Sequence, residues 1–173
     1  MENKIMTHQI KGLITALIII VIGVAGYLSG FGLERWFGWL TYFILCVAVL
    51  WGSVFYANQR KGRVTFGDIF VHGFKMSIVT TLIILVYTII ALSLIFPEMR
   101  EKGMEVARQK LEEQGKLSSE QIGQALDMIR KLFWPITIGT ILLGNLLFGC
   151  IGSLIGAAIA KKNPVNPLDQ SPL

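Results

Sequence analysis

Four long stretches without a charged residue constrain the fold of this chain more than any other feature. They lie at about 12–28, 37–57, 76–96 and 133–160. An α-helix rises 1.5 Å per residue, so even the shortest stretch can cross a thin hydrocarbon core, and the longest must tilt or extend beyond it. The sequence therefore predicts an all-α membrane protein with four transmembrane helices, forming one integral membrane domain over residues 1–173.

Composition excludes an ordinary soluble domain. Charged residues make up only 16% of the chain, against roughly 25% in soluble domains. Apolar residues reach 53%, and both cysteines, Cys46 and Cys150, fall inside apolar runs without a neighbouring histidine. We expect these cysteines to be packing residues. A cleaved signal peptide at the first run is a rival interpretation, but the run extends past the small residues that would mark the cleavage site.

A basic segment joins the second and third apolar runs. Its bases form what we call the basic hinge: Arg60, Lys61, Arg63 and Lys75. Within it, Thr65 and Asp68 have the spacing of a capping box, with Val64 and Ile69 as the hydrophobic staple. The hinge is thus predicted to open the third membrane helix.

Two polar residues near this helix start have helical spacing. Asp68 and His72 lie four residues apart and share one helix face, which we expect to be a polar surface face. The alternative is a functional pair that binds a metal or relays protons. A metal normally needs three or four ligands, and the other histidine, His8, lies in the polar segment predicted at residues 1–11. No metal site is therefore predicted, and Lys4 and Lys11 are the basic residues of that segment.

A charged segment separates the third and fourth apolar runs. Residues 98–131 contain seven basic and seven acidic residues, and Pro97 precedes them. We expect an extramembrane helical hairpin with Gly115 in its turn and Ser118 and Gln121 as a second capping box. The third and fourth spans are thus predicted to be joined by charged helices outside the bilayer.

The last apolar run is rich in small residues. Such residues let helix backbones approach closely in lipid, either within the chain or between copies. We predict helix-packing roles for one set of residues: Asn145, Gly149, Gly152, Ser153, Gly156 and Ala157. The expected partners are the lipid bilayer, another span of the chain, a second copy or a membrane protein. The tail, 163–173, is predicted to be disordered.

Charge distribution predicts the topology. Four spans place both termini and the basic hinge on one side, which carries eight basic and three acidic residues and so the entire net charge of +5. The other side is neutral. Because basic loops stay inside, we expect cytoplasmic termini and an external hairpin.

The chain resembles a bacterial membrane family without assigned activity, domain-of-unknown-function family 4199. Three features carry the resemblance: Val64-Thr65-Phe66-Gly67-Asp68 after the basic turn, Gln114-Gly115-Lys116-Leu117-Ser118 in the charged segment, and the glycine-rich last run ending in Lys161-Lys162. It covers nearly the whole chain. The resemblance implies a multi-pass protein of the bacterial inner membrane and supplies no catalytic residue or cofactor.

No enzyme motif emerges from the sequence. We find no nucleophile elbow, HExxH or phosphate loop, and no acidic or basic residue inside the four runs. The leading hypothesis is a non-enzymatic structural or interaction component, with no cofactor, metal or nucleic-acid partner. The alternatives are a small oligomeric transporter or channel and, third, a membrane enzyme using Asp68 and His72.

Overall fold

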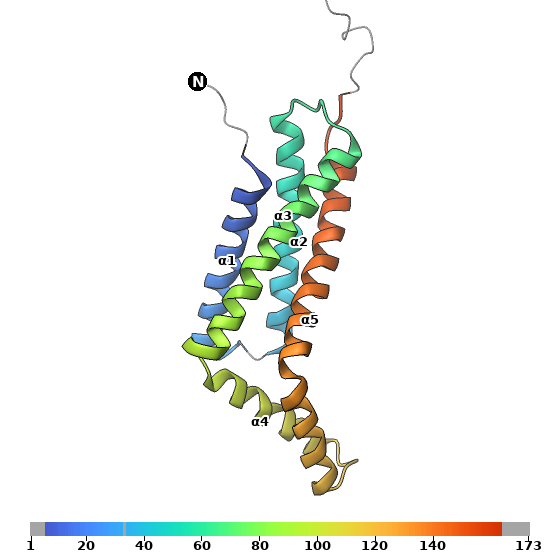
Figure 1. Cartoon of the computed structure of the whole chain (residues 1–173). Coiled ribbons are helices and arrows are strands. Elements are labelled where there is room, and N and C mark those ends of the chain that lie inside the picture. The colour runs from blue at the N-terminus through green and yellow to red at the C-terminus, as the bar shows by residue number, and fades with distance from the viewer. Residues whose placement is uncertain (1–5, 33, 164–173) are drawn as a thin grey trace, which may run out of the picture. The chain divides into compact units, whose positions relative to one another are not determined.

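The computed structural model describes residues 6–32 and 34–163. Every regular element there is helical (Figure 1). They are α1 (His8–Leu28), α2 (Arg35–Gln59), α3 (Phe66–Ile90), the π-helix η1 (Ala91–Ile95), α4 (Glu98–Glu113) and α5 (Ser119–Ile159). Within the described residues, four helices are long and apolar enough to cross a membrane: α1, α2, α3 with η1, and α5. The predicted all-α membrane fold is confirmed.

Both predicted capping boxes are present. At the start of α3, the Thr65 amide donates to Asp68 Oδ2 at 2.9 Å, and the Asp68 amide donates to Thr65 Oγ1 at 3.2 Å. Before α5, Ser118 and Gln121 exchange the same pair of bonds at 2.9 and 3.3 Å. These bonds satisfy backbone amides that have no intrahelical partner at the start of a helix. Because each box involves residues only three positions apart, both helix starts could be predicted from the local sequence.

Two helix boundaries differ from the prediction, and the third span ends where expected but in an unexpected geometry. The first helix begins at His8 rather than near residue 12, because Thr7 acts as its N-cap. The second helix of the hairpin and the last span are a single helix of 41 residues, α5, which contains Pro135. The third span ends in a π-turn, where the Phe96 amide donates to Ala91 O at 2.7 Å, before Pro97 starts α4. The predicted disordered tail lies, beyond residue 163, outside the described residues.

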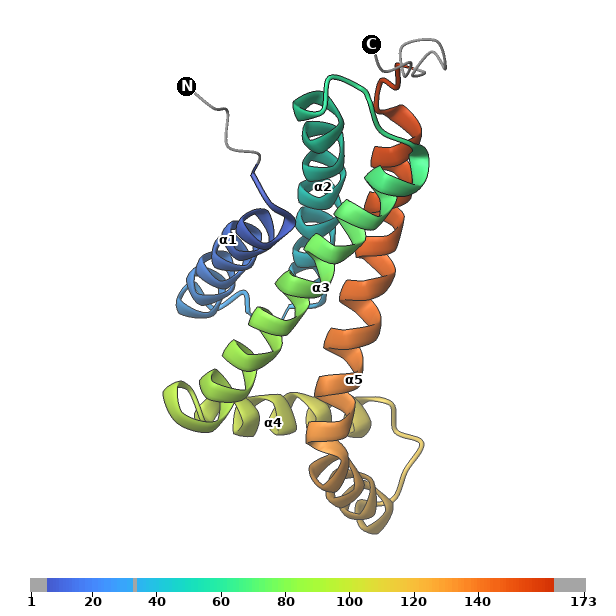
Figure 2. The same cartoon turned by 45° about the horizontal axis from the view of Figure 1, so that its top comes forward.

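The helices form two compact units. The first contains residues up to Ile83 together with those from Leu143 onward, and the second contains Ile84–Leu142. In the first unit, α1, α2, the first part of α3 and the last part of α5 run alongside one another (Figures 1 and 2). A cluster of Ala57, Ile69, Ala157 and Ala160 forms an apolar core where α2, α3 and α5 meet.

The end of α5 is tied to the hinge turn within the first unit. Asn163 donates through its amide nitrogen to Gly62 O at 3.0 Å and through Nδ2 to Lys61 O at 2.9 Å. Gly62 adopts φ +74°, and a Cβ there would approach Asn163 to 3.0 Å. The positive φ therefore favours glycine, and a side chain at this position would also force Asn163 to shift.

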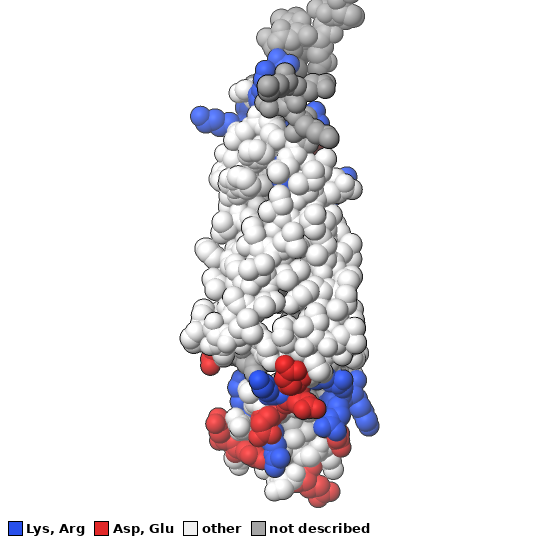
Figure 3. All heavy atoms as spheres, turned by 90° about the vertical axis from the view of Figure 1, so that its left-hand side faces the viewer, with Lys and Arg blue, Asp and Glu red and all other residues white. Residues whose placement is uncertain are grey.

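In the second unit, α4 and the first turns of α5 carry the charged residues. Figure 3 shows blue and red side chains interleaved over this region, whereas the apolar helices show almost no charge on the face drawn. Arg108 and Glu112, one turn apart on α4, form an exposed ion pair at 2.9 Å. The almost uncharged surface of the apolar helices matches the apolar environment of a bilayer core.

Candidate functional site

A buried lysine marks the candidate site in the first unit. Lys11, on the first turn of α1, is only 3% exposed. Its Nζ donates to the backbone oxygen of Gly52 on α2 at 3.1 Å and lies 3.3 Å from His72 Nε2 on α3. It also sits 4.9 Å from the centre of the Phe55 ring. No carboxylate pairs with this ammonium among the described residues.

The position of Lys11 corrects a prediction from the sequence. We expected Lys11 in a polar segment before the first span and no basic residue within a span. The helix instead begins one turn earlier, at His8, so Lys11 lies on the face of α1 turned toward α2 and α3. Gly52 leaves its carbonyl accessible because it has no side chain, and an added Cβ would approach Met76 Sδ to 2.6 Å.

His72 is enclosed by aromatic rings. Its imidazole stacks on Tyr56 with ring centres 4.0 Å apart and an interplanar angle of 8°, and His8 meets its edge at 5.8 Å. His72 is only 8% exposed, so the prediction of a surface position is wrong for this residue. Asp68 is exposed as expected and accepts hydrogen bonds from Thr65. The two residues thus have different partners, because tertiary contacts decide the surroundings of His72.

A cavity of about 380 Å³ opens beside this cluster. Its charged and titratable lining consists of His8, Arg60, Asp68, His72 and Lys75, with Thr7, Tyr56, Gly67 and Val71 completing the wall. Two residues of the basic hinge, Arg60 and Lys75, therefore face the cavity, and Arg60 also lies 5.7 Å from the centre of the Tyr56 ring. The other two, Lys61 and Arg63, do not line it.

The predicted small-residue face packs inside the first unit. A Cβ on Gly152 would lie 2.5 Å from Cys46 O, and one on Gly156 would lie 2.7 Å from Ser53 Cβ. A Cβ on Gly149 would overlap Ser77. Ser153 and Ala157 have no exposed surface, and Asn145 is 5% exposed. The face thus contacts α2 and α3 of the same chain, while the bulky residues Leu143, Leu147 and Ile159 of α5 are exposed.

Sequence reasoning missed Lys11, His8 and Tyr56 as site residues. One signal was present: Thr7 is a good N-cap residue, and its side chain accepts from the Ile10 amide at 3.4 Å. A helix start at this point would have placed His8 and Lys11 on the first turn. No group of three His, Cys, Asp or Glu side chains within residues 6–32 and 34–163 could hold a metal ion.

Comparison with protein families agrees with the resemblance seen in the sequence. The family described as "Protein of unknown function (DUF4199)" matches residues 11–162. The chain belongs to this family. The matched segment of the DUF4199 protein includes Lys11, the basic hinge, both capping boxes and the small-residue face. No curated protein and no solved structure gives a significant match.

Proposed function

We propose that this DUF4199 protein is a non-enzymatic interaction component of the bacterial inner membrane that binds an anionic phosphodiester headgroup. The headgroup occupies the cavity beside His72. Arg60 and Lys75 attract its phosphate at the cavity mouth, and Lys11 supplies a further positive charge behind His72.

The uncompensated charge of Lys11 carries this proposal. Moving an ammonium out of water costs several kcal/mol unless a counter-charge and hydrogen bonds replace its hydration. The carbonyl of Gly52 and the ring of Phe55 supply part of that replacement. An anion in the adjacent cavity supplies the missing negative charge.

The charge distribution supports the position of this cavity at the inner leaflet. We propose cytoplasmic termini, because the bases of the first unit gather with the basic hinge. Anionic lipids of the cytoplasmic leaflet attract nearby bases by about 1 kcal/mol each. A lipid bilayer is thus the partner that this end of the protein fits.

Lipid titration followed by native mass spectrometry tests the proposal. The full chain in a non-ionic detergent is titrated with phosphatidylglycerol and, separately, with zwitterionic phosphatidylcholine. The double variant Arg60→Gln/Lys75→Gln should bind phosphatidylglycerol about 25-fold more weakly, since two lost bases correspond to about 2 kcal/mol. The double variant Lys110→Gln/Lys116→Gln removes the same charge from exposed sites and serves as control. Equal affinity for both lipids, or equal effects of both double variants, would refute the proposal.

A second candidate function is proton-coupled transport by a small oligomeric assembly. The Lys11–His72 contact favours it, because ionisable groups within a membrane span often form proton relays. Purified protein in vesicles with an imposed pH gradient should then conduct protons, and Lys11→Met should abolish the flux. Proton flux indistinguishable from empty vesicles excludes this candidate.

The third candidate, a membrane enzyme, has less support. A reaction that used Asp68 and His72 together would need the two groups to act on one substrate, yet Asp68 is engaged with Thr65 and His72 with Tyr56 and Lys11. Association with a second copy or a membrane partner through the last span remains part of the proposed interaction role. It would use the side of α5 that exposes Leu143, Leu147 and Leu154.

A further inference from the structure

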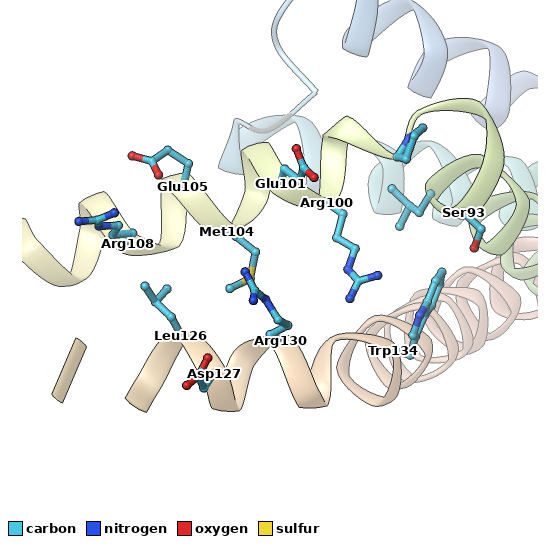
Figure 4. Close-up of a pocket in the computed structure, with 12 residues that line it drawn as sticks. Ser93, Arg100, Glu101, Met104, Glu105, Arg108, Leu126, Asp127, Arg130 and Trp134 are labelled. Atoms are coloured by element: carbon cyan, nitrogen blue, oxygen red, sulfur yellow. The ribbon is translucent and has the colours of Figure 1, made fainter. Parts of the chain in front are cut away.

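A second cavity lies within the second unit, between α4 and the first turns of α5. This groove has a volume of about 680 Å³, and the close-up view shows the residues that line it (Figure 4). Residues from η1, α4 and α5 line it, from Ser93 at one end to Arg108 at the other. It therefore extends from the end of a membrane span into the charged hairpin.

Two guanidinium groups point into this groove from different helices. Arg100 reaches in from α4 and Arg130 from α5 (Figure 4). Neither forms an ion pair with a carboxylate in the described part of the chain. Arg100 lies 5.1 Å from the centre of the Phe133 ring, which holds its side chain over the groove. Both groups thus have hydrogen-bond donors available for a ligand.

The other charged residues of the groove are directed elsewhere. The carboxylates of Glu101 and Glu105 point away from the space between the helices (Figure 4). Arg108 is bonded to Glu112, and this bond raises the pKa of the Arg108 guanidinium above its ordinary value. The remaining charged residue of the lining, Asp127, is exposed and lies along α5. The inward-facing charge is therefore positive, although the whole lining contains as many acids as bases.

An apolar wall continues the same groove. Met104 and Leu126 face each other across it, and Trp134 stands beside Arg100 (Figure 4). All three are half-buried, as is Leu92 at the end nearest the apolar part of α3. A ligand held by the guanidiniums would have apolar surface available on either side of its head.

We propose that this groove binds an anionic amphiphile, with its phosphate monoester between Arg100 and Arg130 and its apolar chain against Met104, Leu126 and Trp134. Arginine suits this head because its planar fork can donate two parallel hydrogen bonds to a phosphate. A phosphate monoester carries a charge of about −1.5 to −2 near neutral pH, which two guanidiniums balance. The apolar chain explains why the arginines are flanked by side chains that a free anion would not need.

Titration calorimetry on the full chain in phosphatidylcholine nanodiscs tests the site. The probes are dioctanoyl phosphatidic acid, which has both phosphate and chains, glycerol 3-phosphate, which lacks the chains, and dioctanoyl phosphatidylcholine, which lacks the monoester. We expect binding of the first probe alone. Arg100→Gln and Arg130→Gln should each weaken it about tenfold, the loss typical of a charge-assisted contact.

Two further variants keep the test specific. Lys110→Gln removes an exposed positive charge from α4 and should leave the affinity unchanged. Leu126→Gln should weaken binding of the amphiphile through the lost apolar contact, with the helical circular-dichroism signal retained. The proposal is overturned if glycerol 3-phosphate binds as tightly as phosphatidic acid, or if both arginine variants match Lys110→Gln.

Discussion

Gly156→Ala should destabilise the protein although alanine is the better helix former. Gly156 lies where α5 crosses α2, and a Cβ there would come within 2.7 Å of Ser53 Cβ and 2.9 Å of Leu50 O. Carbon atoms in van der Waals contact normally lie about 3.5–4.0 Å apart. The added methyl group would therefore overlap Ser53 by about 1 Å, and the backbone of α2 would have to move.

The magnitude follows from two opposing terms. Overpacking a close contact costs typically about 1–3 kcal/mol, whereas replacing glycine by alanine inside a helix gains about 0.8–1 kcal/mol. Gly139, on the same helix, provides the matched control because nothing lies within 4 Å of the position its Cβ would take. Gly139→Ala should therefore increase helix propensity without a steric clash. The two variants should thus differ by about 1–3 kcal/mol in free energy of unfolding.

Thermal unfolding in detergent micelles, followed by tryptophan fluorescence, measures this difference. One kcal/mol shifts Tm by about 2–4 °C for a chain of this size. Gly139→Ala should equal or exceed the wild-type Tm, and Gly156→Ala should fall below the Tm of Gly139→Ala by several degrees. If Gly156→Ala is as stable as Gly139→Ala, the close approach of α5 to α2 does not depend on a glycine at position 156, and the reasoning is wrong.

Three further predictions follow from local contacts and charge. Thr65→Ala removes the hydroxyl that bonds to Asp68 at both 2.8 and 3.2 Å, and should lower Tm by the equivalent of about 1 kcal/mol in the same unfolding assay. Ser53→Ala removes a buried hydroxyl that has no hydrogen-bond partner in the described part of the chain, so Tm should stay constant or rise; a clear drop would reveal a missing partner. Reporter fusions should show cytoplasmic activity after Lys61 and external activity after Leu117, and a cytoplasmic signal at Leu117 would contradict the charge-based topology.

Local interactions made much of this fold predictable. The four spans follow from uncharged runs long enough to cross a bilayer, and the helix starts at Thr65 and Ser118 follow from capping boxes that involve neighbours three residues apart. The glycines of the last span likewise indicated a close packing face, although the sequence left open whether the chain itself or a second copy would cover it. These features depend on local composition and on hydrogen bonds between residues a few positions apart. Both can be inferred directly from the residue types and their spacing in the sequence.

Tertiary packing decided the candidate site. Lys11, Gly52 and His72 lie on three different helices, separated by 41 and 61 residues in the two contacts that Lys11 makes. Helix periodicity shows which residues share a face, but it does not show which neighbouring helix that face will contact. Here the face of α1 that carries Lys11 packs toward α2, where Gly52 leaves its carbonyl accessible. The same dependence sets Arg100 and Arg130 into one groove from two helices. A helix face is buried only when its partner helices are in place. The packed bundle, rather than any one segment of sequence, therefore decides which helix faces meet and which charged groups are buried together.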